Sequence, residues 1–170
     1  MPTRIATAAV IGLAAIGGCS SALRAQTMRS VWDGVYTEAQ ATRGAALFDQ
    51  ECASCHGPAG GGGGTAPALV GSAFAANYDG QTVGDLVERT RQTMPVGKEG
   101  QLSRQQNADI TAFMLQLNGF PAGTAELPRQ AQALNQIRYL ATKPPGSSGV
   151  AGSAGIRAPL ATTRSEREDS

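Results

Sequence analysis

The sequence predicts a small all-α domain. Three segments repeat apolar residues at positions i, i+3, i+4 and i+7, the spacing of one helix face, and each begins at a hydroxyl residue suited to cap a helix. No segment has the pattern of a strand. With 170 residues and 41% hydrophobic side chains, the chain can form one ordinary domain with its own core. We place this domain at residues 31–122.

The first helix begins at Thr37, where Thr37-Glu38-Ala39-Gln40 has the form of a capping box, and runs to about Glu51. Its apolar face holds Ala41, Gly44, Ala45 and Phe48. A glycine inside a helix costs up to about 1 kcal/mol relative to alanine. Because Gly44 stands on the buried face, we expect another helix to cross this one closely at that point.

Two more helices follow. The second begins at Thr82 and ends before Pro95, which pushes the preceding residue out of helical geometry. The third begins at Ser103, in the capping box Ser103-Arg104-Gln105-Gln106, and ends at the C-cap Asn118-Gly119. Their apolar faces consist of Val83, Leu86, Val87 and Thr90, and of Ile110, Phe113, Met114 and Leu117.

A long segment between the first two helices, residues 56–81, is predicted as a loop. A structureless loop of that length is uncommon in a compact domain, so we expect something other than polypeptide to fill the space it encloses. The segment contains an unbroken glycine run, Gly60 to Gly64. No Gly-Lys-Ser/Thr follows this run, which excludes a phosphate-binding loop. We interpret the run as a flexible loop.

The first 25 residues have the features of an export signal. Arg4 is followed by 14 uncharged residues, 5–18, which are too few to span a bilayer. In one interpretation a signal peptide is cleaved after Ala22 or Ala25. In a second, Ile16-Gly17-Gly18-Cys19 acts as a bacterial lipobox and Cys19 carries a lipid; only in this case do we expect contact with a membrane. Both interpretations predict a periplasmic protein.

Residues 123–170 are predicted as a linker and a largely disordered C-terminal tail. Gly, Pro and Ser supply 12 of the 30 positions in 141–170. Such a segment has too little apolar surface to offset the entropy lost on ordering. Before the tail, residues 125–140 have a weak apolar face that suggests a short helix, made by Leu134, Ile137 and Tyr139.

The charge pattern excludes a strongly basic nucleic-acid binder. The formal net charge is +1, from 14 basic and 13 acidic side chains. Residues 31–122 are more acidic, with five basic and nine acidic side chains and a net charge of −4. We therefore expect a protein partner with a neutral or basic docking surface.

The strongest motif is Cys52-Ala53-Ser54-Cys55-His56, and His56 is the chain's single histidine. The pattern C-x-x-C-H is the attachment motif of c-type haem, in which the two thiols add to the haem vinyl groups and the histidine binds the iron. Three other interpretations compete. A zinc site would need a second ligand pair, a thioredoxin-like site would need a βαβ context, and the third is a structural disulfide between Cys52 and Cys55.

With no second histidine, a methionine is the leading candidate for the other axial position. Met94 stands 38 residues after His56, in a segment that follows a helix and can fold over the haem. The competing interpretation makes Met94 a core residue that fills a gap. We assign Met114 to core packing, since it stands on the apolar face of the last helix.

Residues 35–120 resemble a bacterial class I monohaem cytochrome c. Beyond the haem motif, the matching segments are Ala66-Pro67-Ala68-Leu69, Thr93-Met94-Pro95 and Phe113 to Gly119. The resemblance implies a small cytochrome c fold, with three main helices and long loops wrapped around one covalent haem. It also implies that the first and last helices cross at Gly44 against Phe113. The carbonyl of Pro67 is expected to face the His56 ring, and Pro67 is therefore included among the cofactor-binding residues.

The resemblance implies a one-electron carrier and not an enzyme, because ligation by His56 and Met94 leaves no open coordination position. Its partners would be redox proteins: a dehydrogenase or membrane complex as donor and an oxidase or similar acceptor. The lead-in from Ser30 to Tyr36 resembles cytochrome domains that accompany quinoprotein dehydrogenases. Two alternatives stay open. One is a haem sensor or peroxidase-like enzyme with a displaceable sixth ligand, and the other is a bound haem subunit of a dehydrogenase.

Overall fold

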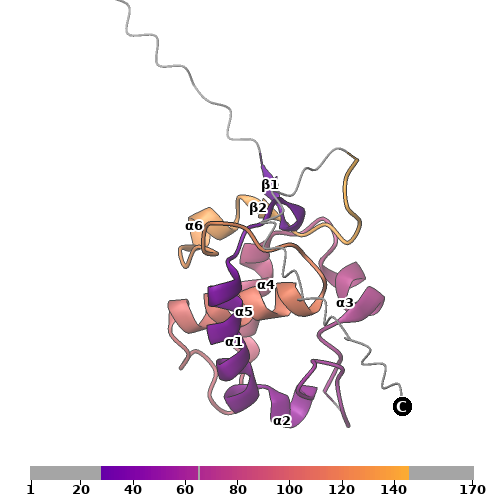
Figure 1. The fold of residues 1–170 in the computed structure, drawn as a ribbon. Coiled ribbons are helices and arrows are strands. Elements are labelled where there is room, and N and C mark those ends of the chain that lie inside the picture. Colours follow the sequence, from indigo (N-terminus) through magenta and orange to yellow (C-terminus); the bar gives the residue numbers. More distant parts are fainter. Residues whose placement is uncertain (1–27, 65, 146–170) are drawn as a thin grey trace, which may run out of the picture.

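The computed structural model describes residues 28–64 and 66–145. The predicted signal, Cys19 and the end of the predicted tail lie outside these residues. In chain order the elements are β1 (Arg29–Ser30), the 3-10 turn η1 (Val31–Asp33), α1 (Glu38–Glu51), α2 (Ala53–His56), α3 (Gly71–Tyr78), α4 (Val83–Thr93), α5 (Arg104–Leu117), α6 (Ala131–Leu134) and β2 (Ile137–Arg138). The small helical domain is confirmed, and α1, α4 and α5 are the three predicted helices (Figure 1).

The predicted helix caps are present, with one difference. Thr82 and Ser103 each form a reciprocal capping box at the start of α4 and α5. Thr37 caps α1 by accepting a hydrogen bond from the backbone of Gln40, but the Gln40 side chain does not bond back. Its amide is buried and pairs with the backbone of Leu127, whose N–H lies 2.6 Å from Oε1 and whose oxygen lies 3.1 Å from Nε2.

The close crossing of α1 and α5 at Gly44 is confirmed. A Cβ atom on Gly44 would lie 1.8 Å from the backbone oxygen of Asp109 and 3.0 Å from Cβ of Phe113. Next to this point the rings of Phe48 and Phe113 meet edge to face, with centroids 5.3 Å apart. The absent side chain at Gly44 therefore allows the two backbones to approach.

The segment predicted as a long loop contains a helix that the sequence analysis missed. Helix α3 begins after Val70 without a side-chain cap, and its eight residues have a weak amphipathic pattern. The rings of Phe74 and Tyr78 have centroids 5.0 Å apart, and both side chains pack against the core. No capping residue marks the start of this helix in the sequence, and packing of its rings stabilises it.

The chain after residue 122 stays on the domain. We call residues 123–145 the C-terminal extension. β2 pairs in parallel with β1, two short strands that the sequence pattern did not reveal. The extension begins beside Gly34. The two backbones are so close there that a Cβ on Gly123 would lie 2.1 Å from the Gly34 oxygen. Its large apolar residues are part of the core, including the four buried side chains Leu127, Leu134, Ile137 and Tyr139.

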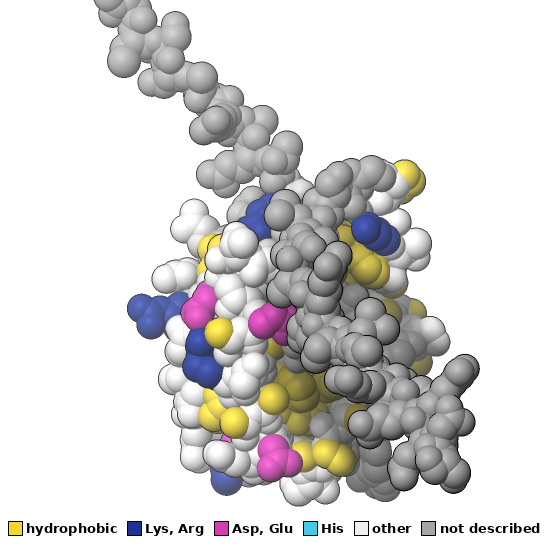
Figure 2. All heavy atoms as spheres, viewed as in Figure 1, with side chains coloured by type: hydrophobic (Ala, Val, Ile, Leu, Met, Phe, Trp, Pro, Cys, Tyr) yellow, Lys and Arg dark blue, Asp and Glu magenta, His cyan; other side chains and the backbone are white. Residues whose placement is uncertain are grey.

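The extension also changes the charge of the domain surface. It adds Arg129, Arg138 and Lys143 against Glu126. Together with Arg29 before the domain, the described residues carry ten acidic and nine basic side chains, a net charge of −1. On the face in Figure 2, acidic and basic side chains are interspersed, and hydrophobic side chains reach the surface below α5. The acidic balance of residues 31–122 is therefore largely compensated within the folded domain.

Candidate functional site

The cysteine pair lies where α1 ends and the short helix α2 begins. Cys52 leaves helical geometry, with φ −124° and ψ −36°, and separates the two helices. The thiol of Cys55 is exposed and that of Cys52 is half-buried, and both are free. Burial, with a smaller contribution from Glu51, raises the pKa of Cys52 to about 11. Both thiols are thus available at the lower end of the molecule, where α2 lies in Figure 1.

His56 is oriented by the segment that contains Pro67. The His56 side chain is only 6% exposed, and its Nδ1 lies 2.8 Å from the Pro67 carbonyl oxygen. Because a carbonyl oxygen only accepts, Nδ1 carries the hydrogen and the lone pair is left on Nε2. This is the contact that the family resemblance implies. It holds the ring in one orientation with Nε2 available for a metal.

The glycine run between His56 and Pro67 forms a hydrogen-bonded turn, where the sequence suggested a flexible loop. The N–H of Gly62 donates to the His56 oxygen at 2.8 Å, and the N–H of Leu69 donates to the Gly60 oxygen at 2.7 Å. Gly60 and Gly62 have φ of 68° and 82°, and a Cβ on Gly62 would lie 2.8 Å from the backbone nitrogen of Ala68. Glycine is required because the chain must double back tightly to bring Pro67 against the ring.

Asn118 is a positioning residue that the sequence analysis treated only as a helix cap. Its Nδ2 donates to the Leu69 oxygen at 2.9 Å and to the Met114 oxygen at 2.8 Å. The first bond ties the segment after Pro67 to the end of α5. An Asn-Gly pair at a helix end is an ordinary C-cap signal, and nothing in the sequence shows that its side chain reaches a segment 49 residues away.

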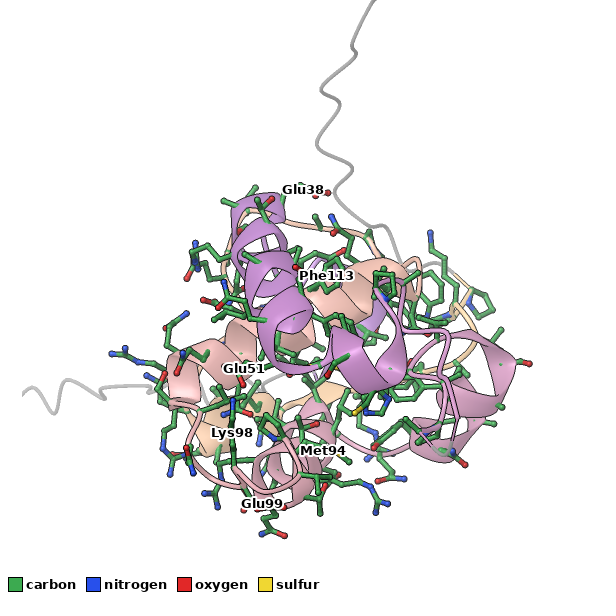
Figure 3. All side chains as sticks on the ribbon, turned by 90° about the horizontal axis from the view of Figure 1, so that it is seen from below. Glu38, Glu51, Met94, Lys98, Glu99 and Phe113 are labelled. Carbon is green, nitrogen blue, oxygen red and sulfur yellow. The ribbon has the colours of Figure 1, made fainter. Side chains whose placement is uncertain are left out.

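Met94 ends α4 in extended geometry, as Pro95 predicts, with φ −136° and ψ 152°. Its side chain is half-buried. The loop that follows is joined to the haem-motif end of α1, because Nζ of Lys98 lies 3.1 Å from Oε2 of Glu51, the residue before Cys52. Figure 3 shows Met94, Lys98 and Glu51 at the same end of the molecule. Met114, by contrast, is 3% exposed within the core, as predicted.

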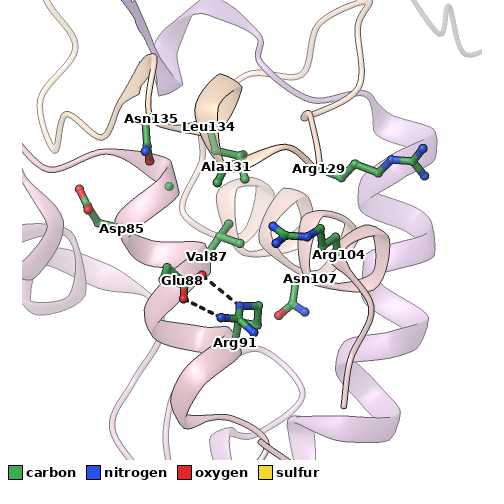
Figure 4. A pocket seen from close by; sticks show the side chains of 11 residues that line it. Asp85, Val87, Glu88, Arg91, Arg104, Asn107, Arg129, Ala131, Leu134 and Asn135 are labelled. Atoms are coloured by element: carbon green, nitrogen blue, oxygen red, sulfur yellow. Dashed lines mark hydrogen bonds and ion pairs between the residues drawn. The ribbon is translucent and has the colours of Figure 1, made fainter. Parts of the chain in front are cut away.

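A cavity of about 190 Å³ lies apart from these residues, between α4, α5 and α6. Its lining includes charged side chains, among which Glu88 accepts two hydrogen bonds of 3.0 and 2.7 Å from Arg91 (Figure 4). This ion pair lowers the pKa of Glu88 to about 2. None of Cys52, Cys55, His56, Pro67 and Met94 lines this cavity.

The residues at the lower end fit one covalently attached haem. They supply two free thiols at the three-residue spacing and, directly after them, a histidine whose Nε2 is left open. When bound, the haem supplies one-electron chemistry at iron. Cys52, Cys55 and His56 would hold the haem, while Pro67 orients the His56 ring and Asn118 holds the segment after Pro67. None of the described helices is long and apolar enough to cross a membrane.

The match to a protein-family model agrees with this chemistry. The family model described as cytochrome C oxidase, cbb3-type, subunit III matches residues 39–114, which include the cysteine pair, His56, Pro67 and Met94. A solved structure, the crystal structure of the sulfane dehydrogenase SoxCD from Paracoccus pantotrophus, is 22% identical. That match covers 94% of this chain and 83% of the other, with a TM-score of 0.42. No curated protein matches the chain.

Proposed function

Because residues 39–114 form a cytochrome c domain that carries one covalent haem c, we propose that this protein is a periplasmic one-electron carrier whose iron is held by His56 and Met94. A cytochrome c domain implies electron transfer. The finer assignment, which includes the sixth ligand, the location and the partners, is the proposal. The observation that carries it is the pairing of His56 Nδ1 with the Pro67 oxygen, which directs Nε2 away as a ligand.

The position of the Met94 loop supports a thioether as the second ligand. The ion pair between Lys98 and Glu51 places this loop beside the start of the haem motif. Met94 is the first residue of the loop and is half-buried. With both axial positions filled by protein atoms, substrate binding at iron is disfavoured and outer-sphere electron exchange remains. A His/Met pair also raises the reduction potential relative to harder ligand sets.

We infer that the partners are redox proteins, a dehydrogenase or membrane complex as donor and an oxidase or similar protein as acceptor. The described residues have a net charge of −1, with the two signs interspersed, and their lysines are Lys98 and Lys143. Such a surface favours a small, transient contact over strong electrostatic steering. The periplasmic location rests on the predicted export signal and on the redox role of the domain.

The test compares two methionine variants of the mature holoprotein. Met94→Leu removes the thioether and nearly keeps the side-chain volume, and Met114→Leu makes the same change at a core methionine. We expect Met94→Leu to lose the absorption band of sulfur-to-ferric-iron charge transfer, to lower the potential and to bind carbon monoxide when reduced. Met114→Leu should keep all three properties of the unchanged protein.

The proposal fails if Met94→Leu leaves the charge-transfer band in place. It also fails if the unchanged reduced protein binds carbon monoxide readily, since a displaceable sixth ligand would favour a sensor or a peroxidase-like enzyme. A stable complex with a dehydrogenase on purification would instead identify a bound haem subunit.

A further inference from the structure

The C-terminal extension pairs with the segment from which α4 starts. The N–H of Gly80 donates to the Tyr139 oxygen, and the N–H of Tyr139 donates to the Gln81 oxygen, both at 2.9 Å. Thr82, the N-cap of α4, forms an antiparallel bridge with Arg138. Three consecutive residues directly before α4 are therefore joined to the backbone of β2 and of the residue after it.

The first two turns of α4 also lie against α6. A Cβ on Gly84 would lie 3.1 Å from the backbone nitrogen of Asn135, so the two backbones approach closely at the start of the helix. About one turn further along, Val87 lines the cavity of about 190 Å³ together with Leu134 of α6 (Figure 4). Both of these side chains belong to the buried core. The extension thus contacts α4 through backbone and through side chains.

The cavity makes this support more important for α4. It lies between α4, α5 and α6, with Val87 and Asn107 among its lining residues. Atoms that line a void lack packing partners on that side, so α5 supplies less contact to α4 here than it would in a filled core. The side of α4 that faces the cavity therefore depends for its packing on Leu134, which belongs to the extension.

The other end of α4 leads directly into Met94. The Met94 N–H donates to the Thr90 oxygen at 2.8 Å, so its backbone continues the hydrogen bonding of the helix. The 11 residues of α4 span about 16 Å and contain no proline, so a displacement at the start of the helix is carried to its end.

We propose that the C-terminal extension positions Met94 by fixing the start of α4, and that Leu134 is a positioning residue for the sixth ligand of the iron. The inference rests on the proposed function, in which Met94 is that ligand. It adds that a segment outside the residues matched by the family model controls how firmly the thioether is held.

The test compares two buried leucines of the extension in the mature holoprotein. Leu134 and Leu127 are each 2% exposed. Leu134 lines the cavity beside α4, whereas the backbone of Leu127 is bonded to Gln40 of α1. Leu134→Ala and Leu127→Ala remove the same atoms from the core, so both should lower the resistance to denaturant. Only Leu134→Ala should loosen α4.

The readouts are the sulfur-to-ferric-iron charge-transfer band and the affinity of the ferric protein for imidazole, which must displace Met94. We expect Leu134→Ala to weaken the band and to bind imidazole about tenfold more tightly, because part of the stability lost at a truncated core leucine is lost from the segment that holds Met94. Leu127→Ala should stay within about twofold of the unchanged protein. Leu134→Ile, which keeps the volume, should restore the original affinity.

The inference is overturned if Leu134→Ala and Leu127→Ala bind imidazole equally, since the change would then follow a general loosening of the fold. If Leu134→Ala does not retain its haem, Leu134→Val and Leu127→Val make the same comparison with a smaller change. An unchanged protein without the charge-transfer band would overturn the Met94 assignment and this inference together. A normal band in the unchanged protein, with no difference between the two leucine variants, overturns this inference alone.

Discussion

A substitution at Gly44, where α1 and α5 cross, tests two physical effects that would change the stability of the protein in opposite directions. In an exposed helix interior, replacing glycine with alanine stabilises a protein by about 0.5–1 kcal/mol, because alanine loses less backbone entropy on folding. At Gly44 the new Cβ would lie 1.8 Å from the Asp109 oxygen and 2.5 Å from the Asp109 carbonyl carbon. Helix propensity and packing therefore predict opposite outcomes for Gly44→Ala.

The magnitude follows from how far the helices must move. Ordinary van der Waals contact for a Cβ begins at 3.4 Å, so α1 and α5 must separate by about 1.6 Å at this point. The obstacle is backbone and cannot rotate away. Inserting a group into a packed interface typically costs about 1–3 kcal/mol, and a backbone clash belongs at the upper end. We expect Gly44→Ala to destabilise the holoprotein by about 2 kcal/mol, after allowing for the propensity gain.

Chemical denaturation of the holoprotein measures this loss. Gly84→Ala is a graded control, because a Cβ on Gly84 in α4 would meet first the Oδ1 of Asn135, at 1.8 Å, a side-chain atom that can turn aside. Its free-energy change should be about 1 kcal/mol or less in either direction. A Gly44→Ala variant at least as stable as the unchanged protein would refute the packing argument. Equal losses of stability in Gly44→Ala and Gly84→Ala would show that the loss does not depend on the α1–α5 crossing.

Two further predictions concern buried polar groups. Gln40→Leu leaves the buried N–H and oxygen of Leu127 unpaired and should lower stability by about 2–5 kcal/mol in urea unfolding. Gln116→Leu, at a half-buried glutamine whose amide bonds Glu38 in an exposed contact, should change stability by about 1 kcal/mol or less. Equal effects at the two glutamines would contradict this reasoning. Burial raises the pKa of Tyr36 to about 12, so the folded state keeps a proton that the unfolded state releases from pH 10. The contribution of protonated Tyr36 to the free energy of unfolding is complete below pH 10 and falls by up to about 1.4 kcal/mol per pH unit between pH 10 and 12. In unfolding curves recorded at pH 9 to 11, Tyr36→Phe should therefore lose stability less steeply with pH than the unchanged protein.

Local sequence signals predict most of the helical part of this fold. The capping residues Thr82 and Ser103 and the stop at Pro95 give boundaries that the structure reproduces. These signals work because each acts within a few residues. Helix α3 has no comparable cap, since Val70 precedes it, and packing of Phe74 stabilises it instead. The sequence contains no local trace of such tertiary stabilisation.

At the candidate site, the sequence predicts the residues that would attach a haem. It does not predict the long-range contacts that hold the surrounding segments in place. The spacing of Cys52, Cys55 and His56 is a covalent requirement of the cofactor and is readable without coordinates. The contact between His56 and Pro67 followed from the family resemblance. The bond from Asn118 to the Leu69 oxygen joins residues 49 apart, and the ion pair between Lys98 and Glu51 joins residues 47 apart. Such pairs have no signature in one sequence, because any exposed lysine or asparagine could form them.

The C-terminal extension shows why composition alone misjudged a boundary. Its apolar residues, among them Leu127 and Tyr139, are too few and too unevenly spaced to form a core of their own. They do not have to, because each fills a place in a core that α1, α3 and α4 already form. The Gln40 amide supplies the backbone bonds that this strand-like segment lacks, and Gly34 lets it approach. The backbone bonds of Tyr139 with Gly80 and Gln81 then fasten the extension to the connection between α3 and α4, so packing and pairing onto the existing core make it part of the folded domain.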